Sequence, residues 1–394
     1  MKLAIVTSYP PSKVTLNEYA YHLVKSFRLK EEVSELILLT DETLGEKEIH
    51  FKQDGCKITI VECWKFNSYS NIINVTRAIN ETKPDGVLFN LQFMKFGDKK
   101  IAAALGLTLP LVCKLKGIPS IVLLHNILEQ VDLESAGFAS NKLTQKAYHF
   151  IGTSLTKLIL QADLVAVTMN KYVTTLKDKY KVDRVKMIPH GTFEIAKNPG
   201  HKLPEGPLKI MTFGKFGTYK KIEALIEAIE LLRKETGLDL EIVIAGTDNP
   251  NVPGYLANAK EKHKHVPQLI FTGYVKEEDV ATLFEESAVV VFPYTSTTGS
   301  SGVLHQAGSY ARAVVMPNLG DLASLVKDEG YRGEFFEPES VLSLANAIKA
   351  IITNDAYRIE LGEANYKAAT AFPMERITAI YLEEFNKIIA KRNN

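Results

Sequence analysis

The stretch Gly214-Lys215-Phe216-Gly217-Thr218-Tyr219-Lys220-Lys221 joins two segments with different hydrophobic patterns. Leu208–Phe213, before it, has the length and apolarity of a strand, and Ile222–Lys234, after it, has apolar residues at helical spacing. A turn from strand to helix lies at the carboxyl end of an open α/β sheet, where ligands bind. Lys215 and Lys220 in such a turn suit an anion such as a diphosphate. Taken alone, two surface lysines on an ordinary loop remain the simpler interpretation.

Strand-length and helix-length segments alternate along the whole chain. The runs Val87–Phe89 and Ile121–Leu124 are continuously apolar, which indicates strands covered on both faces and hence parallel sheets. Strands are predicted at Leu3–Ser8, Glu35–Thr40, Lys57–Val61, Asp85–Asn90, Ser120–His125, Leu164–Thr168, Val185–Ile188, Leu208–Phe213, Leu240–Ala245, Leu269–Thr272, Val289–Phe292 and Ala313–Met316. Helices are predicted at Asn17–Arg28, Ile72–Glu81, Ile101–Lys116, Leu143–Gln161, Lys171–Tyr180, Ile222–Lys234, Glu277–Glu286, Gly302–Tyr310 and Val341–Ile352, and again across Ala356–Lys391 with a break at Pro373.

The polar segment 197–207 is rich in proline and glycine and is predicted to be an interdomain linker. It separates a first Rossmann-like α/β domain, residues 1–196, from a second, residues 208–365. We expect the two parallel-sheet domains to face a cleft that holds the ligand. The last segment, residues 366–394, packs by default in the second domain and alternatively crosses back onto the first.

The composition is that of a globular protein without a strong overall electrostatic field. Of 394 residues, 46% are hydrophobic and 24% charged, and the formal net charge is +1, so any anion site must be local and nucleic acid is not expected. Three cysteines without CxxC spacing argue against disulfides and zinc, and favour a reducing cytoplasm. The run Ile101–Leu124 is the one candidate membrane span, but Pro110 and Lys114 interrupt it, so we predict a buried helix followed by a buried strand.

A second candidate site region runs from Thr295 to Gly302 and consists only of Thr, Ser and Gly. Small residues let a ligand approach the backbone, and the first N–H groups of the following helix would point at it. One such residue would suffice to cap the helix, so eight in succession favour a binding function over capping. The predicted ligand-binding residues are Gly214, Thr298, Gly299, Ser300, Ser301, Gly302 and Gln306, the last being on the same helical face as Gly302.

The pair His125-Asn126 ends a predicted strand of the first domain, where a polar side chain would face the ligand. A histidine satisfied within its loop explains the pair equally well. The sequence has no GxGxxG after its first strand and no GxxxxGK[ST], which lowers support for nicotinamide cofactors and P-loop hydrolysis. His263 and His265 lack further ligands beside them and make a poor metal site, so no cofactor and no metal are expected.

On these motifs the chain resembles the retaining family 4 glycosyltransferases of the GT-B fold. That family carries a G-R-x-x-x-x-K-G turn, which Gly214, Lys215, Lys220 and Lys221 occupy here with lysine in place of arginine. The family also has two glutamates eight residues apart, whose places Thr298 and Gln306 take. His125 matches a family histidine near the transferred sugar. The glycine-rich first loop of the family is replaced by residues 10–17.

Two further segments carry the resemblance. Ile188-Pro189-His190-Gly191 is similar to the I-P-N-G segment before the linker, and residues 371–376 are similar to the closing helix that crosses back to the first domain. The resemblance therefore favours that packing for residues 366–394.

The resemblance implies a hexosyltransferase that uses a UDP- or GDP-linked sugar and no metal. Lys215, Lys220 and the helix N-terminus would stabilise the leaving diphosphate, and His125 would contact the donor sugar. The implied acceptor is a glycan or a lipid-linked sugar, in cell-envelope or exopolysaccharide synthesis. The protein would be cytoplasmic, with membrane contact through Lys114, Lys116, Lys142 or Lys146 as one option and ordinary surface lysines as the other. A non-catalytic scaffold and a nucleotide-sugar epimerase of the same fold stay open.

Overall fold

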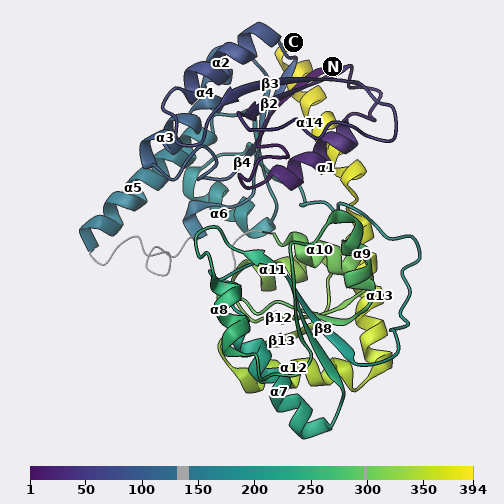
Figure 1. Cartoon of the computed structure of the whole chain (residues 1–394). Coiled ribbons are helices and arrows are strands. Elements are labelled where there is room, and N and C mark those ends of the chain that lie inside the picture. Colours follow the sequence, from purple (N-terminus) through teal and green to yellow (C-terminus); the bar gives the residue numbers. More distant parts are fainter. Residues whose placement is uncertain (131–141, 297–299, 394) are drawn as a thin grey trace. The chain divides into compact units, whose positions relative to one another are not determined.

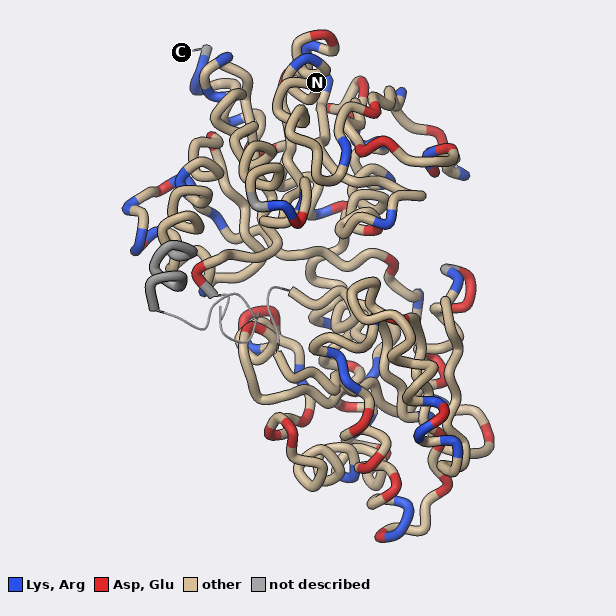
Figure 2. The backbone as a smooth tube through the Cα atoms, turned by 60° about the vertical axis from the view of Figure 1, so that its left-hand side comes forward, with Lys and Arg blue, Asp and Glu red and all other residues tan. Residues whose placement is uncertain are grey.

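The chain folds into two compact units, which this computed structural model describes over residues 1–130, 142–296 and 300–393 (Figure 1). The first unit contains Met1–His190 together with Met374–Asn394, and the second contains Gly191–Pro373. Each is an α/β unit around one sheet, and acidic and basic residues are mixed along most of both (Figure 2).

The first unit has a seven-stranded sheet in the order β3-β2-β1-β4-β5-β6-β7. Its strands are β1 Lys2–Val6, β2 Glu35–Asp41, β3 Lys57–Trp64, β4 Gly86–Leu91, β5 Ser120–Leu124, β6 Leu164–Val167 and β7 Val185–Met187. All neighbouring pairs are parallel. The strands β4 and β5 are buried at every position, because helices cover both faces, as their continuous apolarity predicts.

Helices of the first unit gather in two groups (Figure 1). The helices α1 Asn17–Phe27 and α14 Met374–Asn393 pack on each other, and Ser26 Oγ bonds Thr378 Oγ1 at 2.8 Å between them. The others are α2 Asn71–Thr82, α3 Lys100–Gly106, α4 Leu109–Leu115, α5 Lys142–Ile159 and α6 Asn170–Tyr180, with the 3-10 turn η1 at Leu128–Gln130. The sequence predicted one helix over Ile101–Lys116. Two form instead, because Pro110 is suited to the first turn of a helix and would break its interior.

The second unit has a six-stranded parallel sheet in the order β10-β9-β8-β11-β12-β13. Its strands are β8 Leu208–Phe216, β9 Leu240–Asp248, β10 Leu269–Gly273, β11 Ser287–Val291, β12 Ala313–Pro317 and β13 Glu334–Phe336, and its helices are α7 Glu223–Thr236, α8 Tyr255–Lys262, α9 Glu277–Glu285, α10 Gly302–Ser309, α11 Gly320–Glu329, α12 Val341–Ile352 and α13 Asp355–Ala371. The sequence reading missed β13, α8 and α11. The strand β13 has only three residues, and α8 buries a single residue, so neither leaves a clear periodic pattern.

The strand β8 continues three residues past its predicted end. Gly214, Lys215 and Phe216 pair with β9 in register, so the lysine lies in the strand and not in the turn. The following helix α7 buries its apolar stripe Leu225, Ile226, Ile229 and Leu232 against the sheet, as its spacing predicts.

Residues 191–207 belong to the second unit, so the first unit ends at His190 and not at residue 196. Three side chains hold residues 196–201 in the second unit: Tyr366 donates to the carbonyl of Ala196 at 2.8 Å, Arg358 to that of His201 at 3.0 Å, and Arg312 to that of Gly200. The chain returns to the first unit at Met374, so α13 stays in the second unit and α14 joins the first. The sequence placed that return at residue 366.

Arg312 is 1% exposed and donates to four backbone carbonyls, those of Gly200, Glu285, Ser287 and Tyr310. We expect Arg312→Ala to lower the free energy of unfolding by about 3 kcal/mol or more, since it leaves buried carbonyls without donors. Urea denaturation measures this. The exposed Arg332, paired with Glu360, is the matched control, and its alanine variant is expected to change stability by about 0.5 kcal/mol or less. Equal effects of the two substitutions would contradict the role of Arg312.

Candidate functional site

The turn after β8, residues 217–221, is held on two sides by hydrogen bonds of the backbone, and we call it the lysine turn. Gly217 N–H donates to the carbonyl of Lys220 at 2.9 Å and closes the turn. Lys221 N–H donates to Pro293 at 3.2 Å, and Thr295 N–H donates to Tyr219 at 2.9 Å. The lysine turn therefore pairs with the segment that follows β11, and the structure brings together the two regions that the sequence singled out.

The ammonium group of Lys220 lies in an enclosed position inside this turn. Its Nζ is 4.8 Å from the ring centre of Tyr294 and 6.0 Å from that of Tyr219. A Cβ added to Gly214, whose φ is +137°, would come within 2.5 Å of the same Nζ, so only glycine leaves room for the ammonium group. Burial lowers the pKa of Lys220, and the neighbouring Tyr219 opposes this to a lesser extent.

Within residues 1–130, 142–296 and 300–393, no carboxylate comes within ion-pair distance of Lys220. Two faces of aromatic rings provide the only described partners of its charge, as cation–π contacts. A buried cation without an anion is costly, so this position favours the arrival of one.

Tyr294 connects the lysine turn to the helix α10. It is 5% exposed, its ring lies under the Lys220 ammonium group, and its hydroxyl is hydrogen-bonded to Ser301. Burial raises the pKa of Tyr294, which keeps this hydroxyl protonated. Sequence patterns predicted no role for Tyr294, because nothing in the sequence shows that it would lie between the two motifs.

The helix α10 begins at Gly302, directly beside this lysine and tyrosine pair. Ser301 occupies the N-cap position with an extended backbone, but its side chain makes no cap hydrogen bond. Ser301 therefore does not supply the usual side-chain oxygen to the N-terminal N–H groups of α10 and its positive dipole end. The hydroxyl of Thr218, in the lysine turn, is buried without a hydrogen-bond partner among the described residues. Both features would suit phosphate oxygens.

Behind the start of α10 lies a buried polar network that the sequence did not predict. His305 Nε2 is 3.0 Å from Ser300 Oγ, and His305 Nδ1 is 2.8 Å from Tyr331 Oη. The Glu329 carboxylate is 3.7 Å from His305 Nε2 and makes no hydrogen bond within the described part of the chain. Burial, with a smaller contribution from Asp328, raises the pKa of Glu329 to about 8. This network holds Ser300, one of the predicted ligand-binding residues, from below.

Other predicted residues are less closely connected to this centre. Lys215 is exposed on β8, and Gln306 is half-buried on α10 with no side-chain bond to the lysine turn recorded. Thr298 and Gly299 lie outside the described residues. The roles of all these residues in binding stay predictions.

His125 lies in the first unit at the end of β5. Its Nε2 donates to Asn90 Oδ1 at 2.7 Å, because the Asn90 amide nitrogen is itself a donor to Thr7. Burial, with the charges of His190 and Lys95, holds the pKa of His125 well below its usual range. The imidazole is therefore neutral, with Nδ1 as its acceptor nitrogen.

The loop that replaces the family's glycine-rich segment is anchored by a buried lysine. Lys95 is fully buried and donates to the carbonyl of Thr15 at 2.9 Å and to the hydroxyl of Ser8. Burial lowers the pKa of Lys95 to about 7. Asn17 donates to the carbonyl of Ser12 at 2.7 Å within the same loop. The loop at the carboxyl end of the first sheet is thus held from inside.

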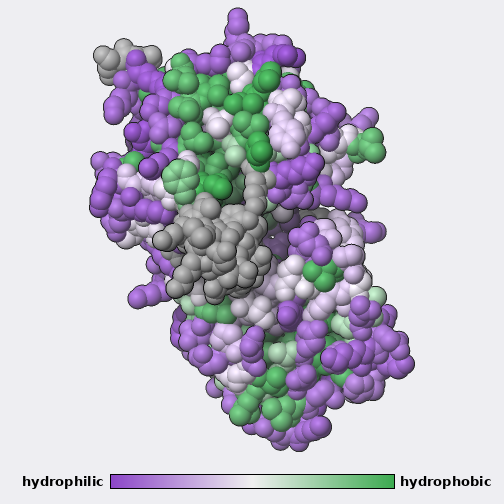
Figure 3. Space-filling view, turned by 90° about the vertical axis from the view of Figure 1, so that its left-hand side faces the viewer, coloured by the Kyte–Doolittle hydropathy of each residue, from purple (hydrophilic) through white to green (hydrophobic). Residues whose placement is uncertain are grey.

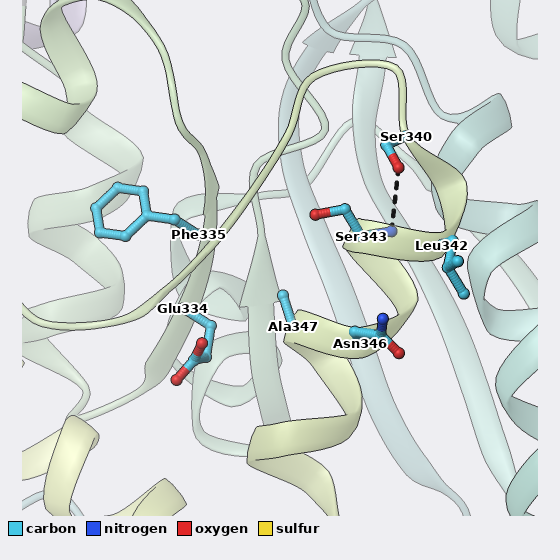
Figure 4. A pocket seen from close by; sticks show the side chains of 7 residues that line it. All are labelled: Glu334, Phe335, Ser340, Leu342, Ser343, Asn346 and Ala347. Carbon is cyan, nitrogen blue, oxygen red and sulfur yellow. Dashed lines mark hydrogen bonds between the residues drawn. The ribbon is translucent and has the colours of Figure 1, made fainter.

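A pocket of about 370 Å³ lies elsewhere in the second unit, between β13 and the start of α12 (Figure 4). Its lining contains Glu334, Phe335, Ser340, Leu342, Ser343, Asn346 and Ala347. It offers no cation, and its one carboxylate, Glu334, already accepts a bond from Tyr357 at 2.5 Å. This pocket does not suit a diphosphate.

The described part of the chain lacks two features, a cluster of metal ligands and a membrane-spanning helix. No group of three His, Cys, Asp or Glu side chains is placed to hold a metal ion. Among the same residues, none of the helices has the length and apolarity needed to cross a bilayer.

The second unit matches a known family. Residues 207–354 match the sequence model described as glycosyl transferases group 1. They are a glycosyl transferases group 1 domain, and the chain has the GT-B fold. The GT-B fold expected from the sequence motifs is thereby confirmed, and the match of residues 207–354 supports the expected glycosyltransferase family.

Similar proteins extend this finding. The chain is 24% identical over 181 residues to the serotype-specific mannosyltransferase WbdA of Escherichia coli, a match that takes in 46% of this chain and 22% of WbdA. The chain thus spans about a fifth of the length of the curated relatives it matches.

Solved structures match over nearly the whole chain. Sucrose-phosphate synthase of Thermosynechococcus elongatus has a TM-score of 0.71 at 14% identity, covering 99% of this chain and 100% of that one. HepE of Anabaena in complex with UDP has a TM-score of 0.67 at 16% identity, covering 98% and 99%. An Escherichia coli trehalose-6-phosphate protein bound with UDP-2-fluoro glucose has a TM-score of 0.66 at 12% identity, covering 98% and 99%.

The carboxyl of Glu329 gives the glycosyl transferases group 1 domain a pH-dependent stability. Because its pKa rises on folding from 4.5 to about 8, the folded chain binds the proton more tightly, and stability is lost as pH rises between these values. We expect Glu329→Gln to remove this loss, which is worth roughly 5 kcal/mol at most. Thermal unfolding against pH measures it. The exposed Glu227→Gln is the control, and a parallel pH profile for Glu329→Gln and the parent would contradict the assignment.

Proposed function

We propose that the chain is a retaining glycosyltransferase that moves a hexosyl unit from a UDP- or GDP-linked sugar to an acceptor hydroxyl. The observation that carries this proposal is the enclosed Lys220 ammonium group, which has no described carboxylate partner and lies beside the uncapped start of α10. A diphosphate would supply the missing negative charge to both. The family match of residues 207–354 supports the same ligand class.

The diphosphate is the leaving group of the proposed reaction. Cleavage of the anomeric C–O bond leaves negative charge on the phosphate oxygens, and in this proposal Lys220, Lys215 and the N–H groups at Ser301 and Gly302 stabilise it. Preorganised donors of this kind contribute about 3 kcal/mol each to the transition state. These donors hold the charge without a metal ion, so we propose that the reaction is metal-independent.

Retention follows, in the proposal, from displacement on one face of the sugar. The oxygen of the departing phosphate accepts the proton of the acceptor hydroxyl as the new glycosidic bond forms on the face that the diphosphate leaves. Thr298 and Gln306 stand where the family has glutamates, so no carboxylate from that motif forms a covalent intermediate. The neutral His125, which presents an acceptor nitrogen, would bond a sugar hydroxyl in the first unit.

The names of similar proteins support a hexosyl donor. HepE was solved with UDP-glucose and WbdA is a mannosyltransferase, and glucose and mannose are both hexoses. We propose a glycan or a lipid-linked sugar as acceptor, in cell-envelope or exopolysaccharide synthesis.

A second candidate is a non-catalytic scaffold of the same fold, favoured by the loss of both family glutamates at Thr298 and Gln306. An epimerase of the same fold would change the donor without any acceptor. Release of free UDP or GDP separates the three. The transferase releases it in proportion to transferred sugar, and the scaffold releases none. Thermal shift measures whether the chain binds the nucleotide at all, since a ligand at a hundred times its Kd stabilises the fold by about 2.7 kcal/mol.

We expect Lys220→Met to lower kcat/KM for sugar transfer by about a hundredfold or more, because the leaving diphosphate loses a buried cation. Lys221→Met is the matched control. Lys221 is adjacent and exposed, and its bond to Pro293 comes from the backbone, so the variant keeps the turn. Steady-state kinetics measure both. A transfer rate that Lys220→Met leaves unchanged would refute the role of this lysine.

A substitution that keeps Lys220 but displaces its ammonium group tests whether the position of that group matters. Gly214→Ala forces a Cβ to within 2.5 Å of Lys220 Nζ, so the ammonium group must move, and UDP or GDP binding should weaken by about tenfold or more. Gly237→Ala is the control, because Gly237 also has a positive φ, of 66°, but faces open space. Calorimetric titration measures both affinities. Equal loss in the two variants would mean that backbone strain and not the lysine is responsible.

A further inference from the structure

Three neighbouring strands of the first sheet end in polar side chains that contact one another. Thr7 directly follows β1, Asn90 lies near the end of β4, and His125 directly follows β5. Because β4 pairs in parallel with both β1 and β5, these residues come together at the carboxyl edge of the sheet. The backbone N–H of His125 donates to the carbonyl of Leu91 at 3.1 Å, so the histidine is held to β4 by its main chain as well.

The hydrogen bonds among these side chains run in one direction. Thr7 Oγ1 donates its single proton to the carbonyl of Ser8 at 2.9 Å, so toward Asn90 it can only accept. The Asn90 amide nitrogen donates to Thr7 Oγ1 at 3.0 Å and to the carbonyl of Leu16 at 3.4 Å. Both contacts use the nitrogen of the amide, so its oxygen is left for the proton on His125 Nε2, 2.7 Å away.

The opposite orientation of the Asn90 amide would lose these bonds. Its oxygen would then face the carbonyl of Leu16 and a threonine hydroxyl whose proton is already bound to Ser8. Buried polar groups that meet like groups in place of partners are costly, so this orientation is disfavoured. The backbone carbonyl of Ser8 therefore determines, through two side chains, which nitrogen of His125 carries the proton.

The other groups around His125 favour the neutral ring. Its ring centre is 4.7 Å from that of Tyr19 on α1 and 6.0 Å from that of His190, which follows β7. Burial, then the charges of His190 and of Lys95 after β4, lower the pKa of His125. Among the described residues, none of the carboxylates forms an ion pair or a hydrogen bond with it.

We propose that Thr7 and Asn90 are positioning residues that hold His125 with Nδ1 as an acceptor, so that it binds a hydroxyl of the transferred sugar and excludes an anionic group there. This inference rests on the proposed sugar transfer and specifies its substrate. A hydroxyl donates to the lone pair of Nδ1, whereas a carboxylate or phosphate has no proton to give and is repelled. Thr7 and Asn90 are fully buried, so neither contributes to the surface drawn in Figure 3, and both act through the half-buried histidine.

Nitrogen NMR of the imidazole rings tests this arrangement in the full chain without ligand, and His125→Gln assigns the signal. We expect the parent to carry a proton on Nε2 and none on Nδ1 between about pH 6 and 8. Thr7→Val removes the acceptor of the Asn90 amide, so in part of the molecules the proton should move to Nδ1. Thr7→Ser keeps the hydroxyl and should give the parent spectrum. Thr40→Val is the matched control, because Thr40 is also fully buried and its hydroxyl has no partner among the described residues.

Asn90→Asp tests the consequence for sugar transfer. Its carboxylate would favour a second proton on His125, which turns Nδ1 into a donor. We expect kcat/KM to fall about a hundredfold at neutral pH and to recover as pH rises, because the ring becomes neutral again with the proton on Nε2. Thr7→Val should lower kcat/KM about tenfold, whereas Thr7→Ser and Thr40→Val should stay near the parent. If Asn90→Asp does not fold, the two Thr7 variants carry the test.

Two outcomes would overturn the proposal. One is a parent spectrum with the proton of His125 on Nδ1, or on both nitrogens, near neutral pH. The other is an equal loss of sugar transfer in Thr7→Val and Thr40→Val, since a general loss of packing would then be responsible. Circular dichroism shows that each variant is folded. The spectrum needs no nucleotide, so a chain that transfers no sugar but carries the proton on Nε2 refutes the proposed function while the role of Thr7 and Asn90 in positioning His125 stands.

Discussion

The ammonium group of Lys220 is partly withdrawn from water, and no carboxylate among the described residues pairs with it. The cation–π contacts with Tyr294 and Tyr219 compensate only part of this cost. Several features of the second unit serve to keep it there: glycine at position 214, the bonds between the lysine turn and the segment after β11, and the aromatic ring beneath it. Such an arrangement is stable enough to persist and is improved by an incoming anion.

Tyr294 makes the lysine turn and the start of α10 one unit. Its ring supports the cation and its hydroxyl holds Ser301, so the charge and the helix N-terminus keep a fixed spacing. Beneath them, His305 and Glu329 hold Ser300 through buried polar contacts. Rigid support of this kind is what electrostatic stabilisation of a leaving group requires, because donors that must reorganise contribute less.

The first unit shows a different use of a buried lysine. Lys95 donates its hydrogen bonds to Ser8 and Thr15, in the loop after β1. Its ammonium group therefore holds this loop in place and is not available to a ligand. The neutral His125 beside Asn90 presents an acceptor nitrogen near this loop's sheet edge. Lys95 is fully buried and has hydrogen-bond acceptors of its own, whereas Lys220 is half-buried and its described partners are aromatic rings. We therefore propose Lys220 and not Lys95 as the partner of an anion.

The sequence by itself determined the alternation of strands and helices, both parallel sheets and the family, because continuous apolar runs and the 3.6-residue period are local signals. It also led us to predict a binding role for the segments 214–221 and 295–302, from their charge and their small residues. Only the tertiary structure decided that Lys220 is enclosed while Lys215 is exposed, since this depends on three extra residues of β8 pairing with β9. The same holds for Tyr294, for Glu329 and for Arg312, which binds the predicted linker to the second unit. Their partners are distant in sequence, and no local sequence pattern shows which distant side chains will come into contact in the folded chain.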